Sequence, residues 1–323
     1  MSHGGFAETF RAIEDEIGRV VLGQADVIRH VLVAMLAGGH VLLEGPPGLG
    51  KTLLARTVAR TFGVTFRRVQ FTPDLMPSDV TGGNIFNQRL HEFEFRPGPV
   101  FTQLLLADEI NRAPAKTQAS LLEAMGDRQV SVDGVTHVLP RPFFVLATQN
   151  PIESEGTYPL PEAQIDRFLM KLLIGHPSEA VEIELLDHVV AGFDASDLDR
   201  ASVRTIVDGP AIEAMRQEAR RIRVDPTIRE YIARLVQRTR HHPHVDLGAS
   251  PRASIALLLC AQVVAAAEGR DFVVPDDVKE LARPVLRHRF LMQPDAELEG
   301  ITADAVCESV LRDVAVPGGE KRS

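Results

Sequence analysis

The sequence is short of the features that mark several broad classes of protein. Its 323 residues include only two cysteines, Cys260 and Cys307, both in apolar segments with helical spacing. This count suits a reducing compartment rather than a disulfide-rich secreted fold, and we expect both thiols in the core. An N-terminal apolar run and a membrane-length span are both absent, so we expect a cytoplasmic protein without a transmembrane helix.

The sequence also lacks an excess of positive charge and a low-complexity composition. It has 35 Lys and Arg against 44 Asp and Glu, a net charge of −9. This balance gives no global attraction to nucleic acid, although it does not exclude a local basic patch. The 24 glycines and 21 prolines are unremarkable for this length, as judged against average usage. With 45% hydrophobic residues, the chain can bury a large core, and we expect two domains.

The segment Val41–Thr52 carries the clearest chemical signal. Three apolar residues end a predicted strand, the glycine-rich turn GPPGLGKT follows, and residues 53–59 are predicted to form a helix. Glycines in such a turn let backbone N–H groups converge on phosphate oxygens at a helix N-terminus, while Lys51 reaches the same phosphates. The alternative is a chance glycine-rich turn. We predict a nucleoside triphosphate site comprising Gly45, Pro46, Pro47, Gly48, Leu49, Gly50, Lys51, Thr52 and Leu53.

A pair of acids follows a second apolar strand. Leu104–Ala107 is apolar and is followed by Asp108 and Glu109. A Mg²⁺ ion on the nucleotide phosphates needs a carboxylate opposite the phosphate loop, so we expect Asp108 and the Thr52 hydroxyl as its ligands. Hydrolysis needs a group that polarises water, and Glu109 is the candidate. The alternative is a strand that simply ends in surface acids.

A polar residue also follows the next buried strand. The continuous apolar run Phe143–Ala147 predicts a buried strand, and Asn150 stands shortly after it, before Pro151. An amide there would lie beside the γ-phosphate and orient the attacking water. The alternative is an ordinary strand-ending turn before proline.

The order of predicted elements gives the fold class. Up to Ile174, strands alternate with helices, which predicts an α/β domain with a parallel sheet between helices. Beyond 175–177, the sequence is predicted to be entirely helical. Two segments interrupt the first part: 72–99 is predicted to contain a hairpin, with an irregular surface loop as the alternative, and 129–138 is a hairpin with an Asp133-Gly134 turn.

Four segments together resemble the MoxR family of AAA+ ATPases: GPPGLGKT, LLLADEINRAPAKTQASLLEAM, ATQNP and LPEAQIDRF. The match covers nearly the whole chain. The resemblance implies an αβα nucleotide-binding core over residues 1–176, which carries both hairpins as insertions, and an all-α lid over residues 177–323. It also implies ATP hydrolysis with Mg²⁺ in a ring of identical subunits, usually a hexamer.

The resemblance also implies roles for individual residues. Asn150 resembles sensor 1, Arg167 resembles the arginine finger that reaches the γ-phosphate of the adjoining subunit, and Arg252 resembles sensor 2. A cation at the γ-phosphate stabilises charge that develops during transfer. Without the resemblance, each arginine would be interpreted as part of a surface ion pair. The family's segment near the adenine, which selects ATP over GTP, corresponds to Val21, Leu22, Gly23 and Gln24.

The family resemblance implies a chaperone-like machine that remodels protein complexes or maturing metalloenzymes, often beside a partner with a von Willebrand factor A-type domain. A nucleic-acid motor is the first alternative. The net charge, and the presence of only Arg89 and Arg96 around the first hairpin, argue against it. A non-hydrolysing nucleotide switch or scaffold is the second, and the intact acid pair argues against that. The histidines at 241, 242 and 244 are expected to form a solvated loop rather than a metal site.

Overall fold

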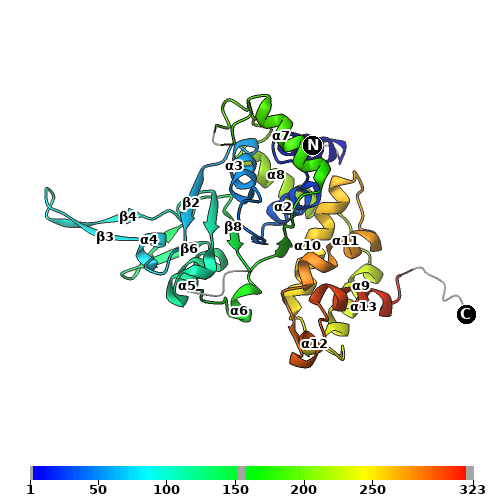
Figure 1. Ribbon diagram of the computed structural model, residues 1–323. Coiled ribbons are helices and arrows are strands. Elements are labelled where there is room, and N and C mark those ends of the chain that lie inside the picture. Colours follow the sequence, from blue (N-terminus) through cyan, green and yellow to red (C-terminus); the bar gives the residue numbers. More distant parts are fainter. Residues whose placement is uncertain (1–2, 152–156, 196, 318–323) are drawn as a thin grey trace, which may run out of the picture.

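The computed structural model describes residues 3–151, 157–195 and 197–317 and has a parallel sheet at its centre (Figure 1). The five strands have the order β2-β5-β8-β1-β9, and every neighbouring pair is parallel. They are β1 (Val41–Glu44), β2 (Phe66–Gln70), β5 (Leu104–Asp108), β8 (Phe144–Gln149) and β9 (Met170–Leu173). The predicted α/β class is confirmed, and the apolar runs that predicted β1, β5 and β8 are buried because both faces of the sheet are covered.

Alternating side chains along the strands divide the core into two parts. Leu43, Leu106 and Leu146 belong to one apolar cluster, and Leu105 and Val145 belong to the other. The first cluster includes residues of α1 (His3–Gly18), α2 (Ala25–Ala37) and α3 (Lys51–Thr61). The second includes residues of α4 (Pro77–Thr81), the 3₁₀ helix η1 (Ile110–Arg112) and α5 (Ala115–Asp127). The sheet is therefore the middle layer of three.

Two antiparallel hairpins extend the sheet domain. β3 (Gly82–Asn87) pairs with β4 (Glu92–Pro97), and this hairpin projects away from the body of the molecule (Figure 1). The segment is therefore not an irregular loop. β6 (Gln129–Val132) pairs with β7 (Val135–Val138) across Asp133 and Gly134, whose φ angles of 50° and 81° are those of a tight hairpin turn. The Phe95 and His137 rings stack at 3.7 Å, which joins the two hairpins.

After β9 the chain is mainly helical (Figure 1). The helices there are α7 (Glu179–Val190), α8 (Gly209–Ala219), α9 (Pro226–Thr239), α10 (Pro251–Ala267), α11 (Pro275–Leu286), α12 (Pro294–Leu298) and α13 (Ala303–Asp313). Proline opens four of them, where its missing N–H costs no helical hydrogen bond. The Asp225 and Ser250 side chains cap α9 and α10 by accepting from backbone N–H groups.

The prediction of an entirely helical second part was wrong in one detail. β10 (Val245–Leu247) and β11 (Leu291–Met292) form a short antiparallel pair. Strands of three and two residues leave no alternating pattern to detect, and their pairing depends on the tertiary fold.

One apolar cluster continues from α1, α2 and α3 into the helical part. α10 packs against α1 and α2 as well as against α9 and α11. Cys260 and Cys307 lie in this cluster as free thiols, and burial raises the pKa of each to about 12. The division after residue 176 stays a prediction. Across the described ranges, no helix has the length and apolarity needed to cross a membrane.

Candidate functional site

The turn between β1 and α3 has a backbone that requires glycine. Gly48 and Gly50 have φ angles of 83° and 74°, in the left-handed region that side chains disfavour. A Cβ on Gly45 would lie 2.4 Å from the carbonyl oxygen of Ile174. The end of the neighbouring strand β9 therefore leaves no room for a side chain at this position. The turn therefore presents backbone at the N-terminus of α3, the geometry that binds phosphate.

Lys51 opens α3 directly after this turn. Its ammonium donates a hydrogen bond to the Gly45 carbonyl oxygen at 2.6 Å, so the side chain folds back over the loop. Burial lowers the pKa of Lys51, an effect that Asp108 and Glu109 oppose. Thr52 and Leu53 follow on the first turn of the helix.

Asp108 and Glu109 lie opposite the loop because β1 and β5 are parallel strands separated only by β8, so their carboxyl ends share one edge. Thr148, at the end of β8, ties the two acids together. Its hydroxyl donates to Asp108 Oδ1 at 2.5 Å and accepts from the Glu109 backbone N–H at 2.8 Å. Glu109 has a φ of 54°, a left-handed conformation that is rare outside glycine and that occurs often at functional sites.

Two side chains of β2 hold the acids from the other side. Arg68 donates to Asp108 Oδ2 from Nε at 3.0 Å and from Nη2 at 2.7 Å. Gln70 donates to Glu109 Oε2 at 2.7 Å, and the guanidinium of Arg112 lies 3.2 Å from the same oxygen. Sequence reasoning missed Arg68, Gln70 and Thr148. The alternation along β2 puts 68 and 70 on one face, but only the strand order shows that β2 neighbours β5.

These residues enclose a cavity of about 300 Å³. Asn150 is 5% exposed and belongs to its lining, at the carboxyl end of β8. The lining residues are Pro47, Gly48, Leu49, Gly50, Lys51, Thr52, Arg68, Gln70, Asp108, Glu109, Thr148 and Asn150. The structure thus brings together the predicted phosphate loop, both acids and the predicted water-orienting amide.

The segment Val21–Gln24 lies beside the phosphate loop. The Gln24 amide nitrogen donates to the Leu49 carbonyl oxygen at 2.9 Å. Gly23 has a φ of 71° and packs so closely against Val181 of α7 that a Cβ would approach its Cγ1 to 2.5 Å. The Gln24 Oε1 atom is buried, and within the described part of the chain no group donates a hydrogen bond to it. An unsatisfied buried acceptor next to a phosphate loop fits a ligand that carries a donor, such as the exocyclic amine of adenine.

The residues at the cavity also fit a magnesium ion. Thr52 and Asp108 supply one hydroxyl and one carboxylate, and Mg²⁺ in nucleotide sites usually needs only one or two protein oxygens beside phosphate and water. A site made by protein side chains alone is not present within the described ranges, where no three His, Cys, Asp or Glu residues gather. This includes the histidines at 241, 242 and 244.

Arg167 and Arg252 lie outside the cavity. Arg167 is exposed and follows α6 (Glu162–Ile165), and its Nη1 donates to the Leu122 carbonyl oxygen of α5 at 2.6 Å. Arg252, on the first turn of α10, has a side chain that is 62% exposed and lies 3.6 Å from Asp166. The structure therefore separates these two arginines from the lysine, acids and amide of the cavity in the same chain.

Asp166 joins the segment around Arg167 to the helical part. Arg289, which follows α11, donates to Asp166 Oδ1 at 2.9 Å and to the carbonyl oxygens of Phe168 and Leu169 at 2.6 and 2.9 Å. Its side chain is 2% exposed, and burial lowers its pKa. Ser250 donates to the other Asp166 oxygen at 3.2 Å. Sequence reasoning missed this junction, because its members lie far apart in the chain.

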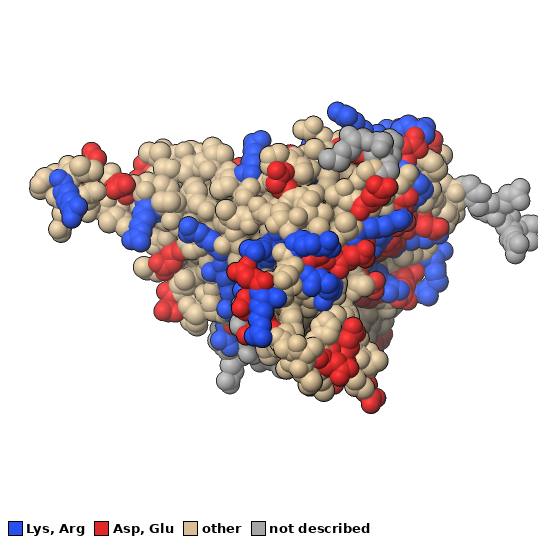
Figure 2. All heavy atoms as spheres, turned by 90° about the horizontal axis from the view of Figure 1, so that it is seen from above, with Lys and Arg blue, Asp and Glu red and all other residues tan. Residues whose placement is uncertain are grey.

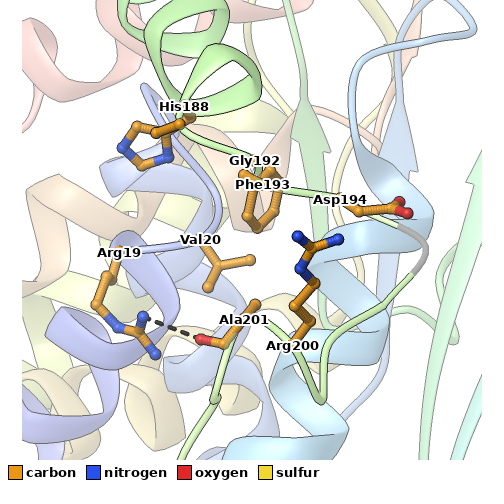
Figure 3. A pocket seen from close by; sticks show the side chains of 9 residues that line it. Arg19, Val20, His188, Gly192, Phe193, Asp194, Arg200 and Ala201 are labelled. Carbon is orange, nitrogen blue, oxygen red and sulfur yellow. Dashed lines mark hydrogen bonds between the residues drawn. The ribbon is translucent and has the colours of Figure 1, made fainter.

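A second cavity of about 380 Å³ lies between the end of α1 and the segment that follows α7. Figure 3 shows Arg19 and Arg200 on opposite sides of it, with Phe193 above. Arg19 is already bound to the Ala201 carbonyl oxygen and to Glu16. The described residues that line this cavity include none from the phosphate loop or the acid pair. The acid pair and most of the predicted phosphate-loop residues lie at the smaller cavity instead.

The surface shows mixed charge. On the face in Figure 2, basic and acidic side chains are interspersed over the body, and the projecting hairpin carries only a few charges of either sign. This face therefore offers no continuous basic track of the kind that follows a nucleic-acid backbone.

Comparisons with known proteins agree with this geometry. The model of the ATPase family associated with various cellular activities (AAA) matches residues 40–170, and that of the AAA lid domain matches residues 237–310. The uncharacterized protein YeaC of Bacillus subtilis is 48% identical over 95% of this chain and 94% of its own length. Chaperone MoxR1 of Mycobacterium tuberculosis is 43% identical over 94% of this chain and 81% of its own.

A solved structure shares the whole fold. The crystal structure of a proposed ATPase from Cytophaga hutchinsonii is 41% identical and superimposes with a TM-score of 0.89. The alignment covers 97% of this chain and 96% of that one. The similarity therefore extends over both the sheet and the helical part.

Proposed function

Because this chain belongs to the MoxR family of AAA+ ATPases, we propose that it hydrolyses ATP to ADP and phosphate in the 300 Å³ cavity. The observation that carries the proposal is the convergence of Lys51, Asp108, Glu109 and Asn150 around one phosphate-binding turn. These are the groups that phosphoryl transfer to water requires: a cation for the phosphates, a metal ligand, a base and an orienting amide.

Each group has a position suited to its role. The backbone of Pro47–Gly50 and the Lys51 ammonium bind the phosphates, and Gln24 Oε1 accepts from adenine. Thr52 and Asp108 would hold Mg²⁺, which would neutralise charge on the phosphate oxygens. Glu109 accepts a proton from the attacking water, while the Asn150 amide orients that water. Cavity walls of buried strand ends keep these groups in place.

We further propose that the active unit is a ring, with six subunits as the expected number. Arg167 is exposed and does not line its own cavity, which supports its role as a finger given to the neighbouring subunit. Arg252 lies on the first turn of α10 and contacts Asp166, the residue before Arg167. This contact offers a route by which nucleotide state at the lid affects the finger.

The proposed output is chaperone-like work on a protein client. The β3–β4 hairpin exposes Phe86, Leu90 and Phe93 by 47%, 62% and 73%. Apolar side chains on a projecting hairpin cost solubility unless they bind something, and movement of the hairpin during the ATP cycle would apply force to a bound protein. A partner with a von Willebrand factor A-type domain is expected to help select the client.

The test compares two variants that lose one negative charge each. Glu109→Gln should lower phosphate release from ATP by about 100-fold or more, because it removes the base, while leaving ATP binding intact. Glu123→Gln changes an exposed acid of α5 outside the cavity and should behave like wild type. Equal rates in Glu109→Gln and wild type would refute the role of Glu109 as the base, and no phosphate release by the wild type would refute the proposed hydrolysis. Stimulation of the wild-type rate by DNA, with salt-dependent binding, would favour a nucleic-acid motor instead.

A further inference from the structure

Arg68 is the second cation of the phosphate cavity, beside Lys51. It extends from β2, and its guanidinium places both Nε and Nη2 on one oxygen of Asp108. The side chain remains 48% exposed, whereas that of Asp108 is 11% exposed. A long, half-exposed side chain therefore lies on a nearly buried carboxylate.

This arrangement occupies three of the roughly four acceptor positions of the Asp108 carboxylate. Oδ2 accepts two hydrogen bonds from Arg68, and Oδ1 accepts one from the Thr148 hydroxyl at 2.5 Å. If Mg²⁺ approached Oδ2, it would meet a guanidinium on the same oxygen, and two cations so close repel each other strongly in a partly buried site. Binding of the ion to this carboxylate therefore favours the departure of one of the present partners.

Arg68 is the partner that can move. Thr148 is fully buried on a central strand, and its hydroxyl also accepts from the Glu109 N–H. Its departure would leave this part-buried donor unsatisfied. Arg68 has a flexible stem and access to solvent within the cavity. The nearest new anion is the bound nucleotide, because ATP brings more negative charge than one Mg²⁺ neutralises.

We propose that Arg68 exchanges partners during the cycle: it neutralises Asp108 in the empty site and donates to the γ-phosphate when Mg²⁺ and ATP bind. Arg68 would then be a catalytic arginine supplied by the same subunit, in addition to the finger from the neighbour. The guanidinium suits this role because it stays charged and offers paired donors that match phosphate oxygens. The inference rests on the proposed function, since it needs the cavity to bind ATP.

The experiment measures equilibrium binding of Mg-ATPγS and Mg-ADP by displacement of a fluorescent ADP analogue. Arg68→Gln should weaken ATPγS binding about tenfold and leave ADP binding within about twofold, because only ATPγS carries the third phosphate. Arg67→Gln is the matched control. It removes the same charge from the preceding residue of β2, which is exposed and outside the cavity lining, and it should change neither affinity. Arg68→Lys should recover part of the loss.

Other results would overturn the inference. If Arg68→Gln changed both affinities equally, or lowered the Mg²⁺ concentration required for both nucleotides to the same extent, Arg68 would be only the partner of Asp108. If it changed neither affinity, Arg68 would have no role toward the nucleotide. Retained ADP binding by the variant shows that it is folded. Failure of the wild-type protein to bind either nucleotide would refute the proposed function itself. Failure of the proposed function and failure of the Arg68 inference therefore give different results.

Discussion

The Asp166–Arg289 ion pair should be essential for the stability of the junction between the sheet and the helical part. Asp166→Asn keeps the shape of the side chain but removes the charge that faces Arg289. The Arg289 side chain is only 2% exposed. Its guanidinium therefore cannot replace the lost carboxylate charge with hydrogen bonds to water. Removal of one partner from a buried pair costs about 3–5 kcal/mol. Arg289 keeps its backbone acceptors at Phe168 and Leu169, so we expect the lower end, about 3 kcal/mol.

The assay is urea unfolding, with a second aspartate as the control. Asp199 pairs with Arg60 at 2.5 Å, but its side chain is 81% exposed. Asp199→Asn should therefore lower the free energy of unfolding by no more than about 1 kcal/mol. If the two variants lost the same small amount, the buried pair would not hold the junction and the reasoning from burial would fail.

Three further predictions concern stability. Gly45→Ala should lower the free energy of unfolding by about 1–3 kcal/mol, since its Cβ would meet the Ile174 carbonyl oxygen, whereas Gly175→Ala has open space and should be nearly neutral in the same urea titration. Burial lowers the pKa of His40 to about 4. The contribution of neutral His40 to the free energy of unfolding is therefore complete above about pH 6.5 and falls by about 3 kcal/mol toward pH 4. His40→Gln should reduce this dependence of stability on pH. Burial alone would raise the pKa of Glu16, but hydrogen bonds from Arg19 and Arg204 lower it to about 2. Stability from Glu16 is therefore present above about pH 4.5 and lost toward pH 2, and Glu16→Gln should remove this slope in acid titrations followed by circular dichroism.

The sequence predicted the part of the site that local pattern determines. The apolar strands that end at Glu44 and Asp108, and the glycines between Gly45 and Gly50, each fix a local backbone, and a parallel sheet brings strand ends together. The location of Asn150 in the same cavity followed from the same rule. The roles of these residues remain proposals until activity is measured.

The contacts that set the charge of the site depend on tertiary structure. Arg68 faces Asp108 only because β2 neighbours β5. The sequence of residues 66–70 does not predict this strand order. Arg289 reaches Asp166 across 123 positions of sequence, and a single arginine after a helix carries no local signal. β10 and β11 were missed for the same reason, since their pairing depends on the helices around them.

The central claim is that ATP is hydrolysed at an interface to which one subunit gives the phosphate loop and the next gives Arg167. Lys51→Ala should abolish nucleotide binding, and Arg167→Ala should lower turnover about a thousandfold. The decisive measurement is phosphate release after the two inactive variants are mixed in equal amounts. About a quarter of the interfaces in a randomly mixed ring would combine an intact loop with an intact finger, so the account predicts that activity returns. A mixture as inactive as each variant alone would contradict it.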